Sequence, residues 1–193
     1  MSVRSKTSLS VLAGVGVLLT LVLVALSNST SAAAQVSVAD LSTISQKSLA
    51  AFGVSDPLTI EGTAGERTFF AGSDDEGNEC RMIGQSPRQV DAIFCASPGN
   101  PLTGNGRAAL IIPSSYAPSA PDGQPDASRE RLLGIWGFAR PDIKAVRLIN
   151  DDGDTQTIVA SRGLFGTSTP LADATAIEVV NDAGAVVQEM KLG

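Results

Sequence analysis

From residue 67 onward the sequence consists of short runs rich in β-branched and apolar residues, separated by turn residues. No stretch of this region repeats apolar residues with the 3.6-residue period of a helix. Short runs at this spacing are typical of all-β domains. The sequence therefore predicts an all-β fold, an antiparallel sandwich or barrel-like domain of about 8–9 strands. The expected strands are residues 67–71, 79–83, 90–96, 107–112, 132–138, 145–150, 155–160, 176–180 and 186–192.

Three connections between these runs share one hairpin chemistry, an Asp or Asn followed by a Gly, at residues 73–77, 150–153 and 181–184. The Asp or Asn side chain bonds to the backbone that follows it, and Gly supplies the positive φ that closes such a turn. We therefore expect an antiparallel hairpin at each of the three.

The run at residues 132–138 is apolar at positions that face both sides of a strand. Such a strand is buried on both faces. We therefore expect Trp136 to be a core side chain rather than a platform for a ligand. Two later strands alternate between apolar and charged residues. We expect Val146 and Leu148 to face inward with Arg147 outward, and Ile177 and Val179 to face inward with Glu178 outward.

The first 34 residues have the layout of a secretory signal. Arg4 and Lys6 precede an uncharged apolar run at residues 7–26, and small residues follow. Positive charge before the run keeps that end in the cytoplasm, so the rest of the chain is expected outside.

Ala32 and Ala34 predict a cleavage site between Ala34 and Gln35. The alternative is an uncleaved anchor helix, because about 20 apolar residues span a bilayer core. The protein then contacts the membrane only through residues 7–26. Both interpretations place the body of the chain outside the cytoplasm.

A short helix is expected directly after this segment. Ser37 and Asp40 have the spacing of a capping box, and Gly53 is a typical helix stop. The apolar stripe is thin and consists of Leu41, Ile44, Ser48 and Leu49. Residues 59–66, with two glycines, are expected to form a connector. The expected domains are a signal or anchor at 1–34, a helix and connector at 35–65, and a β-rich domain at 66–193.

Cys80 and Cys95 are the two cysteines of the chain and lie 15 residues apart. In an exported chain such a pair is a disulfide by default. Redox pairs usually have the spacing C-x-x-C, and a zinc site needs further Cys or His ligands, whereas the chain has no His. We therefore predict a structural Cys80–Cys95 disulfide.

Two proline- and glycine-rich segments, residues 97–106 and 113–128, do not fit a strand pattern. Both are therefore expected to be loops, and long loops in a compact domain are often functional or disordered. For residues 113–128, whose composition buries little apolar area, a mobile loop is favoured over a binding loop.

The order of several features resembles that of uncharacterised exported β-domain proteins of actinobacteria. These features are Cys80, Cys95, the run Gly134-Ile135-Trp136-Gly137-Phe138, the pair Pro141-Asp142 and the strand at 145–150. The resemblance covers roughly residues 66–193 behind an N-terminal apolar segment, and Ile143 stands where those proteins have Gly. It implies an extracytoplasmic location and a small Cys-paired β domain, without an activity.

Charge and composition exclude several functions. Removal of residues 1–34 takes away Arg4 and Lys6 but no acid, which leaves 12 basic and 20 acidic side chains and a formal charge of −8. This charge repels phosphate backbones, so no nucleic-acid partner is expected. Without His, the chain has no Ser-His-Asp, Cys-His or His-based metalloprotease site. No cofactor is expected.

Acidic side chains gather at two expected hairpin tips, and calcium prefers several oxygen ligands at one point. Neither tip has the spacing of an EF-hand loop, and acid-Gly turns are ordinary connections, which favours solvated turns over a metal site. The candidate ligands are Asp74, Asp75, Glu76 and Glu79 at the first tip, and Asp151, Asp152 and Asp154 at the second.

These features favour a non-enzymatic binding or assembly module of the cell envelope, with an envelope protein or polymer as its partner. One alternative is an envelope enzyme that uses paired carboxylates in the manner of a glycoside hydrolase, although no catalytic residue is assigned. The other is a calcium-dependent β domain. A cleft with two facing acids favours the enzyme, whereas an exposed sheet edge or apolar patch favours a binding module.

The predicted cleavage site is testable in the native host. Mass spectrometry of the purified protein should find a chain that begins at Gln35, because Ala32 and Ala34 occupy the positions that signal peptidases recognise. Intact residues 1–34 in the membrane fraction would show an anchor instead.

Overall fold

The computed structural model describes residues 33–97, 99–103, 106–116 and 131–192. Contacts divide the chain into two units, Met1–Ser31 and Ala32–Gly193, and the described residues all belong to the second. The signal or anchor predicted at residues 7–26 lies outside the described residues. Within the described part, no helix has the length and apolar character needed to cross a membrane.

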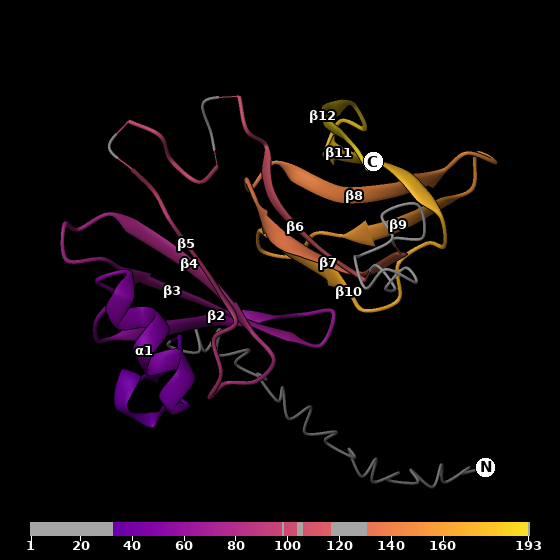
Figure 1. The fold of residues 1–193 in the computed structure, drawn as a ribbon. Helices are drawn as coiled ribbons and strands as arrows, with labels where there is room; N and C mark the ends of the chain where they lie inside the picture. Colours follow the sequence, from indigo (N-terminus) through magenta and orange to yellow (C-terminus); the bar gives the residue numbers. More distant parts are fainter. Residues whose placement is uncertain (1–32, 98, 104–105, 117–130, 193) are drawn as a thin grey trace, which may run out of the picture. The chain divides into compact units, whose positions relative to one another are not determined.

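The described residues form twelve β-strands, a short 3-10 helix, η1 (Val38–Asp40), and an α-helix, α1 (Thr43–Ala51), as Figure 1 shows. The strands are β1 (Gln35–Val36), β2 (Leu58–Ala64), β3 (Arg67–Ser73), β4 (Glu79–Gly84), β5 (Ala92–Cys95), β6 (Ala109–Tyr116), β7 (Arg131–Ala139), β8 (Ile143–Asn150), β9 (Thr155–Val159), β10 (Leu164–Thr167), β11 (Ala174–Asn181) and β12 (Val186–Lys191). They form three antiparallel sheets with the orders β1-β2-β3-β4-β5, β10-β7-β6 and β12-β11-β8-β9. The all-β prediction is confirmed, with three more strands than the nine expected runs.

Strand β2 overturns the connector predicted at residues 59–66. It pairs with β3 along its length, and only Gly65 and Glu66 join the two strands. The boundary expected between residues 65 and 66 therefore falls inside a hairpin. The sequence pattern fails here because Glu61 and Gly62 interrupt the alternation. The sequence pattern does not predict strand β10 because this strand has only four residues, one of them Gly166.

Helix α1 begins later than predicted, because Ser37 and Ser42 cap different helices. The Ser37 hydroxyl accepts a hydrogen bond from Ala39 N and caps η1. The Ser42 hydroxyl accepts one from Ser45 N and caps α1. Gly53, with a φ of 68°, follows the end of the helix as predicted.

One face of α1 docks on the five-stranded sheet, beside which Figure 1 draws it. Leu49 is fully buried in the core below the helix, and Leu41, just before the helix, joins the same core. The buried Ser45 hydroxyl accepts a hydrogen bond from Val90 N at 2.9 Å. Ile44, which the expected stripe includes, is 77% exposed. Leu41, Leu49 and the buried Ser45 hydroxyl therefore hold the helix against the five-stranded sheet.

The three-stranded sheet is buried on both faces, and β7 is its middle strand. On one face Ile135 and Ala139 belong to the core shared with the four-stranded sheet. On the other face Trp136 and Phe138 belong to the core shared with the five-stranded sheet. The Trp136 indole N–H donates to Gly65 O at 2.8 Å and so ties the β2–β3 turn to this sheet. The prediction that the run at 132–138 is buried on both faces is confirmed for residues 134–138, whereas Leu133 is 52% exposed.

Alternation in the four-stranded sheet is also as predicted. Val146, Leu148, Ile177 and Val179 are fully buried. Between them, Arg147 and Glu178 form an ion pair with an N–O distance of 2.6 Å.

The three predicted hairpin turns are present, and each has a glycine with positive φ: 81° at Gly77, 84° at Gly153 and 82° at Gly184. Side-chain oxygens close the turns as expected. Asn150 Oδ1 accepts from Asp154 N at 2.8 Å, and Asn181 Oδ1 accepts from Ala185 N at 2.9 Å.

Strand β6 extends into the loop predicted at 113–128, where Pro113 pairs with Ile135 and Ser114 with Gly134. Proline is tolerated there because β6 is an edge strand of its sheet, where a missing N–H breaks no ladder hydrogen bond. Residues 117–130 of the predicted loop lie outside the described residues, as do residues 98, 104 and 105 of the loop predicted at 97–106.

The predicted disulfide between Cys80 of β4 and Cys95 of β5 is confirmed. The two cysteines are paired residues of neighbouring strands, and Cys80 is fully buried. The bridge therefore fixes the short edge strand β5 to the rest of its sheet.

Replacing both cysteines by Ala should lower the free energy of unfolding by about 2–5 kcal/mol, because loss of a native bridge frees the unfolded chain. Urea unfolding of the two proteins measures the difference. Reduction of the wild type without substitution should give a loss of the same size. If the wild type and the double variant unfold at the same urea concentration, the bridge does not stabilise the fold.

Candidate functional site

A cleft of about 570 Å³ opens where strands of all three sheets come together. Phe138 of β7, Ile143 of β8 and Leu164 of β10 line it and are buried, whereas Val159 of β9 also lines it and is 70% exposed. Pockets that bind small ligands have volumes in this range. The charged residues of the lining are three acids and three bases: Glu61, Glu79, Asp182, Arg81, Lys144 and Arg162.

Glu61 reaches the cleft from a β-bulge in β2. Ile60 pairs with Phe70 and Gly62 pairs with Phe69, so Glu61 is an extra residue without a partner on β3. A bulge bends its strand and redirects the side chain of the extra residue.

Lys144 reaches the cleft from a second bulge, in β8. Ala145 pairs with Val180 and Ile143 pairs with Asn181, which leaves Lys144 as the extra residue. Bulges are over-represented next to functional sites because they redirect side chains in this way.

Arg162 lines the cleft from the tight turn between β9 and β10, in which Ser161 and Leu164 exchange backbone hydrogen bonds. Its φ is 52°, in the left-handed region that favours glycine. For a residue with a Cβ this backbone costs on the order of 1 kcal/mol. Backbone strain of this kind clusters at ligand-binding sites.

Arg81 of β4 joins two carboxylates of the cleft. It forms an ion pair with Glu61 through Nη1 and one with Glu79 through Nε, the latter at 2.6 Å. Its guanidinium carbon also lies 5.9 Å from the centre of the Phe138 ring. Burial opposes the charge of Arg81, but the hydrogen bonds and charges of the two carboxylates outweigh it and raise the pKa above its ordinary value. Arg81 is thus a permanent cation that fixes Glu61 in place.

Glu61 has one acceptor atom left over. Its Oε1 binds Arg81, whereas its Oε2 is buried and accepts no hydrogen bond from any described residue. A buried carboxylate oxygen without a donor is unfavourable. Such atoms in a native fold are markers of strain or of a binding role.

The two sides of the cleft differ in charge. On the side of the five-stranded sheet, the charges of Glu61 and Glu79 exceed that of Arg81 by one negative charge. On the side of the four-stranded sheet, Lys144 and Arg162 exceed Asp182 by one positive charge. Neither Lys144 nor Arg162 forms an ion pair with a residue that the structure describes. The arrangement suits a ligand with a donor at one end and an anion at the other.

At the first acidic tip, the Asp74 carboxylate stabilises the turn in which it lies. Its Oδ1 accepts hydrogen bonds from the backbone N–H of Glu76 and of Asn78, and its Oδ2 accepts one from the Asn78 side chain at 2.9 Å. The hydrogen bond from the Asn78 side chain, together with the backbone donors, lowers the pKa of Asp74.

The other acids of this tip point to separate partners. Glu79 pairs with Arg81 in the cleft, and Glu76 Oε2 accepts from the Asn78 side chain at 3.3 Å. The carboxylate of Asp75 lies against Gly53, just after α1. The structure does not bring the four predicted ligands together at one point.

At the second tip, Asp154 contacts Asn150 across the turn, and Asp151 and Asp152 are exposed. Among the described residues, these three acids do not form a group whose oxygens converge as metal ligands.

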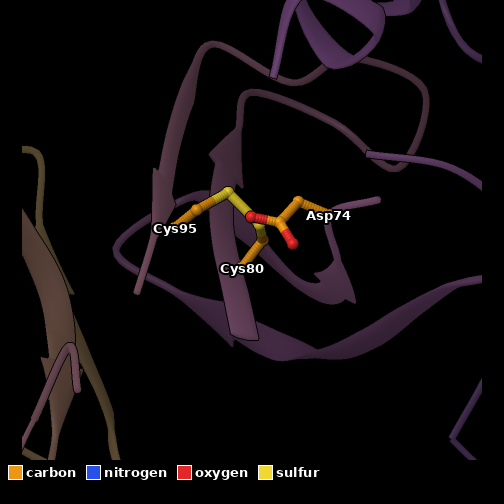
Figure 2. Close-up of side chains that lie close together, drawn as sticks. All are labelled: Asp74, Cys80 and Cys95. Carbon is orange, nitrogen blue, oxygen red and sulfur yellow. A yellow bond between two sulfur atoms is a disulfide. The ribbon is translucent and has the colours of Figure 1, made fainter. Parts of the chain in front are cut away.

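One group of potential metal ligands is compact, and it consists of Asp74, Cys80 and Cys95. Figure 2 shows the Asp74 carboxylate next to the bond between the two sulfur atoms. The metal ligand in cysteine sites is the thiolate, which a disulfide does not offer. This group is therefore a bridge beside a turn carboxylate and not a metal centre.

The residues of the predicted cleavage site lie beside the five-stranded sheet. Ala34 O accepts a hydrogen bond from Ile60 N at 2.8 Å, and Gln35 begins β1, where it pairs with Thr59. Ala32 lies outside the described residues.

Three charged residues of the cleft, Glu61, Lys144 and Arg162, do not follow from strand periodicity, because they sit where the periodicity breaks. One local signal points to them. Glu61 precedes Gly62 and Arg162 precedes Gly163, and an isolated glycine beside a charged residue in a strand region indicates a bulge or tight turn. Lys144 has no such signal.

Comparisons with protein-family models, with curated proteins and with solved structures find no match for this chain.

The lowered pKa of Asp74 predicts a specific dependence of stability on pH. Because the folded-state pKa lies below its ordinary value of 3.8, the stabilisation is complete above that pH and is lost as the pH falls through the lowered value. Asp74→Asn keeps one acceptor oxygen but removes the charge. The variant should unfold more easily than the wild type at pH 7, and the difference should shrink at strongly acid pH in urea titrations.

Asp75→Asn and Asp152→Asn serve as controls, since exposed changes shift stability by no more than about 0.5 kcal/mol. Millimolar calcium should not raise the melting temperature of any of these proteins. A rise in the wild type that Asp75→Asn or Asp152→Asn abolishes would establish a metal site at that hairpin.

Proposed function

We propose that this protein is a non-enzymatic binding module of the cell envelope and that the cleft described above holds its ligand. The observation that carries the proposal is the origin of three charged side chains of the lining. Glu61 and Lys144 come from bulges, and Arg162 comes from a left-handed turn. Other bulges and left-handed residues lie elsewhere in the fold, but these three bring charged side chains to one cleft, and such departures are over-represented at binding sites.

The proposed location outside the cytoplasm is supported by two features. A disulfide persists in oxidising compartments and is rare in the cytosol. The pattern of Arg4, Lys6 and the apolar run at 7–26 is that of an export signal or anchor.

The ion pairs of the cleft favour binding over carboxylate catalysis. Glu61 and Glu79 are two acids in one cleft, which is the arrangement expected of the enzyme alternative. However, both accept hydrogen bonds from the same guanidinium, that of Arg81. Glycoside hydrolysis needs one carboxylic acid that holds its proton and a second group free to attack or to activate water. Two carboxylates fixed by one arginine suit recognition better.

Binding to the envelope is testable with protein purified from the native host and with insoluble cell-wall material of the same host. The wild type should sediment with this material. The double variant Lys144→Gln/Arg162→Asn should bind about tenfold more weakly, because it loses two charged contacts. Asn tolerates the left-handed backbone at position 162, so the fold should be retained.

The matched control is Arg88→Gln/Lys191→Gln, which removes the same charge from exposed positions outside the cleft. It should sediment like the wild type. Equal binding by the wild type and the cleft variant, or no binding by the wild type, would overturn the proposed function.

A further inference from the structure

We infer that the ligand of the cleft is a short peptide whose C-terminal carboxylate binds Lys144 and Arg162. The inference rests on the proposed binding function and names the class of ligand.

The carboxylate is indicated by two neighbouring cations without acidic partners. Ala160 N donates to Lys144 O at 2.9 Å, which places the Lys144 backbone two residues from Arg162 across the β8–β9 pair. Neither side chain forms an ion pair with a described residue. Arginine and lysine bind a carboxylate through charge-assisted hydrogen bonds, which are stronger than neutral ones.

The opposite side of the cleft offers an acceptor. The Glu79 side chain lines the cleft and is 48% exposed, and Arg81 binds only its Oε1. The second carboxylate oxygen of Glu79 can accept a hydrogen bond from an amide N–H of a bound peptide, whereas Glu61 Oε2 is buried out of reach. A ligand with an amide N–H at one end and a carboxylate at the other matches the negative and positive sides of the cleft.

The apolar lining favours a peptide over a sugar. Sugars are bound on exposed aromatic faces, but Phe138, the aromatic residue of the lining, is only 4% exposed. Val159 also lines the cleft and is 70% exposed. Its aliphatic side chain fits a small aliphatic side chain of a ligand.

Two matched probes test the carboxylate. N-acetyl-trialanine with a free C-terminus and the same peptide with a C-terminal amide differ only in the charge of that end. Both are titrated by NMR into isotope-labelled protein purified from the native host. The free acid should shift the backbone amide signals of residues 61, 144 and 160–163 and should bind about tenfold more tightly than the amide.

Single substitutions assign the contacts. Lys144→Gln should weaken binding of the free acid but not of the amide, whereas Lys191→Gln, another exposed strand lysine, should change neither. Glu79→Gln keeps an oxygen for Arg81 but replaces the free acceptor by an NH₂ donor. It should therefore weaken both peptides by the same factor. Unchanged NMR spectra elsewhere show that each variant is folded.

Equal dissociation constants for acid and amide would overturn the inference, as would signal shifts confined to residues outside the cleft. Failure of both peptides to bind at millimolar concentration would overturn it as well. None of these outcomes contradicts the proposed function if the wild type sediments with cell-wall material and the cleft variant does not.

Discussion

The fold depends on a three-stranded sheet that is apolar on both faces. Strand β7 alternates its side chains between two cores, with Ile135 and Ala139 on one side and Trp136 and Phe138 on the other. On one face of each larger sheet, buried side chains pack against this middle layer. A polar substitution on either face of β7 would therefore leave a buried group without a partner and would separate two sheets at once. The hydrogen bond from the Trp136 N–H to Gly65 O ties the five-stranded sheet to the three-stranded sheet.

The sequence predicts this architecture wherever periodicity and turn chemistry agree. The three Asx-Gly hairpins, the disulfide and a two-faced buried run all follow from local rules, and all are present, the buried run over residues 134–138. Strand β2 does not follow, because Glu61 breaks the alternation on which strand prediction depends. The start of α1 does not follow either, because the Ser37–Asp40 spacing that predicts a capping box belongs to η1, whereas Ser42 caps α1. Three sheets instead of one sandwich result from pairings far apart in the sequence, which local patterns do not encode.

The cleft shows why the candidate site is harder to predict than the fold. Its charged residues come from β2, β4, β8 and two turns, so no spacing in the sequence connects them. The acidic tips, which the sequence makes conspicuous, use their carboxylates largely within their own turns. The cleft balances three acids with three bases, although the whole chain has a net charge of −6. Lys144 and Arg162 thus provide a local positive region in an acidic protein. Salt screens the repulsion between an anionic ligand and acidic side chains that lie more than about 10 Å away.

The bulges at Glu61 and Lys144 have a consequence for engineering. Each is a single extra residue between two paired ones, so a deletion at either position would restore continuous pairing at that point. Replacement of Arg162 by glycine would likewise relieve its backbone. Procedures that idealise a backbone or select for thermal stability favour all three changes. They would yield a more regular and more robust protein with a smooth surface in place of the charged cleft, so the irregular positions are those that any stabilised version of this chain has to keep.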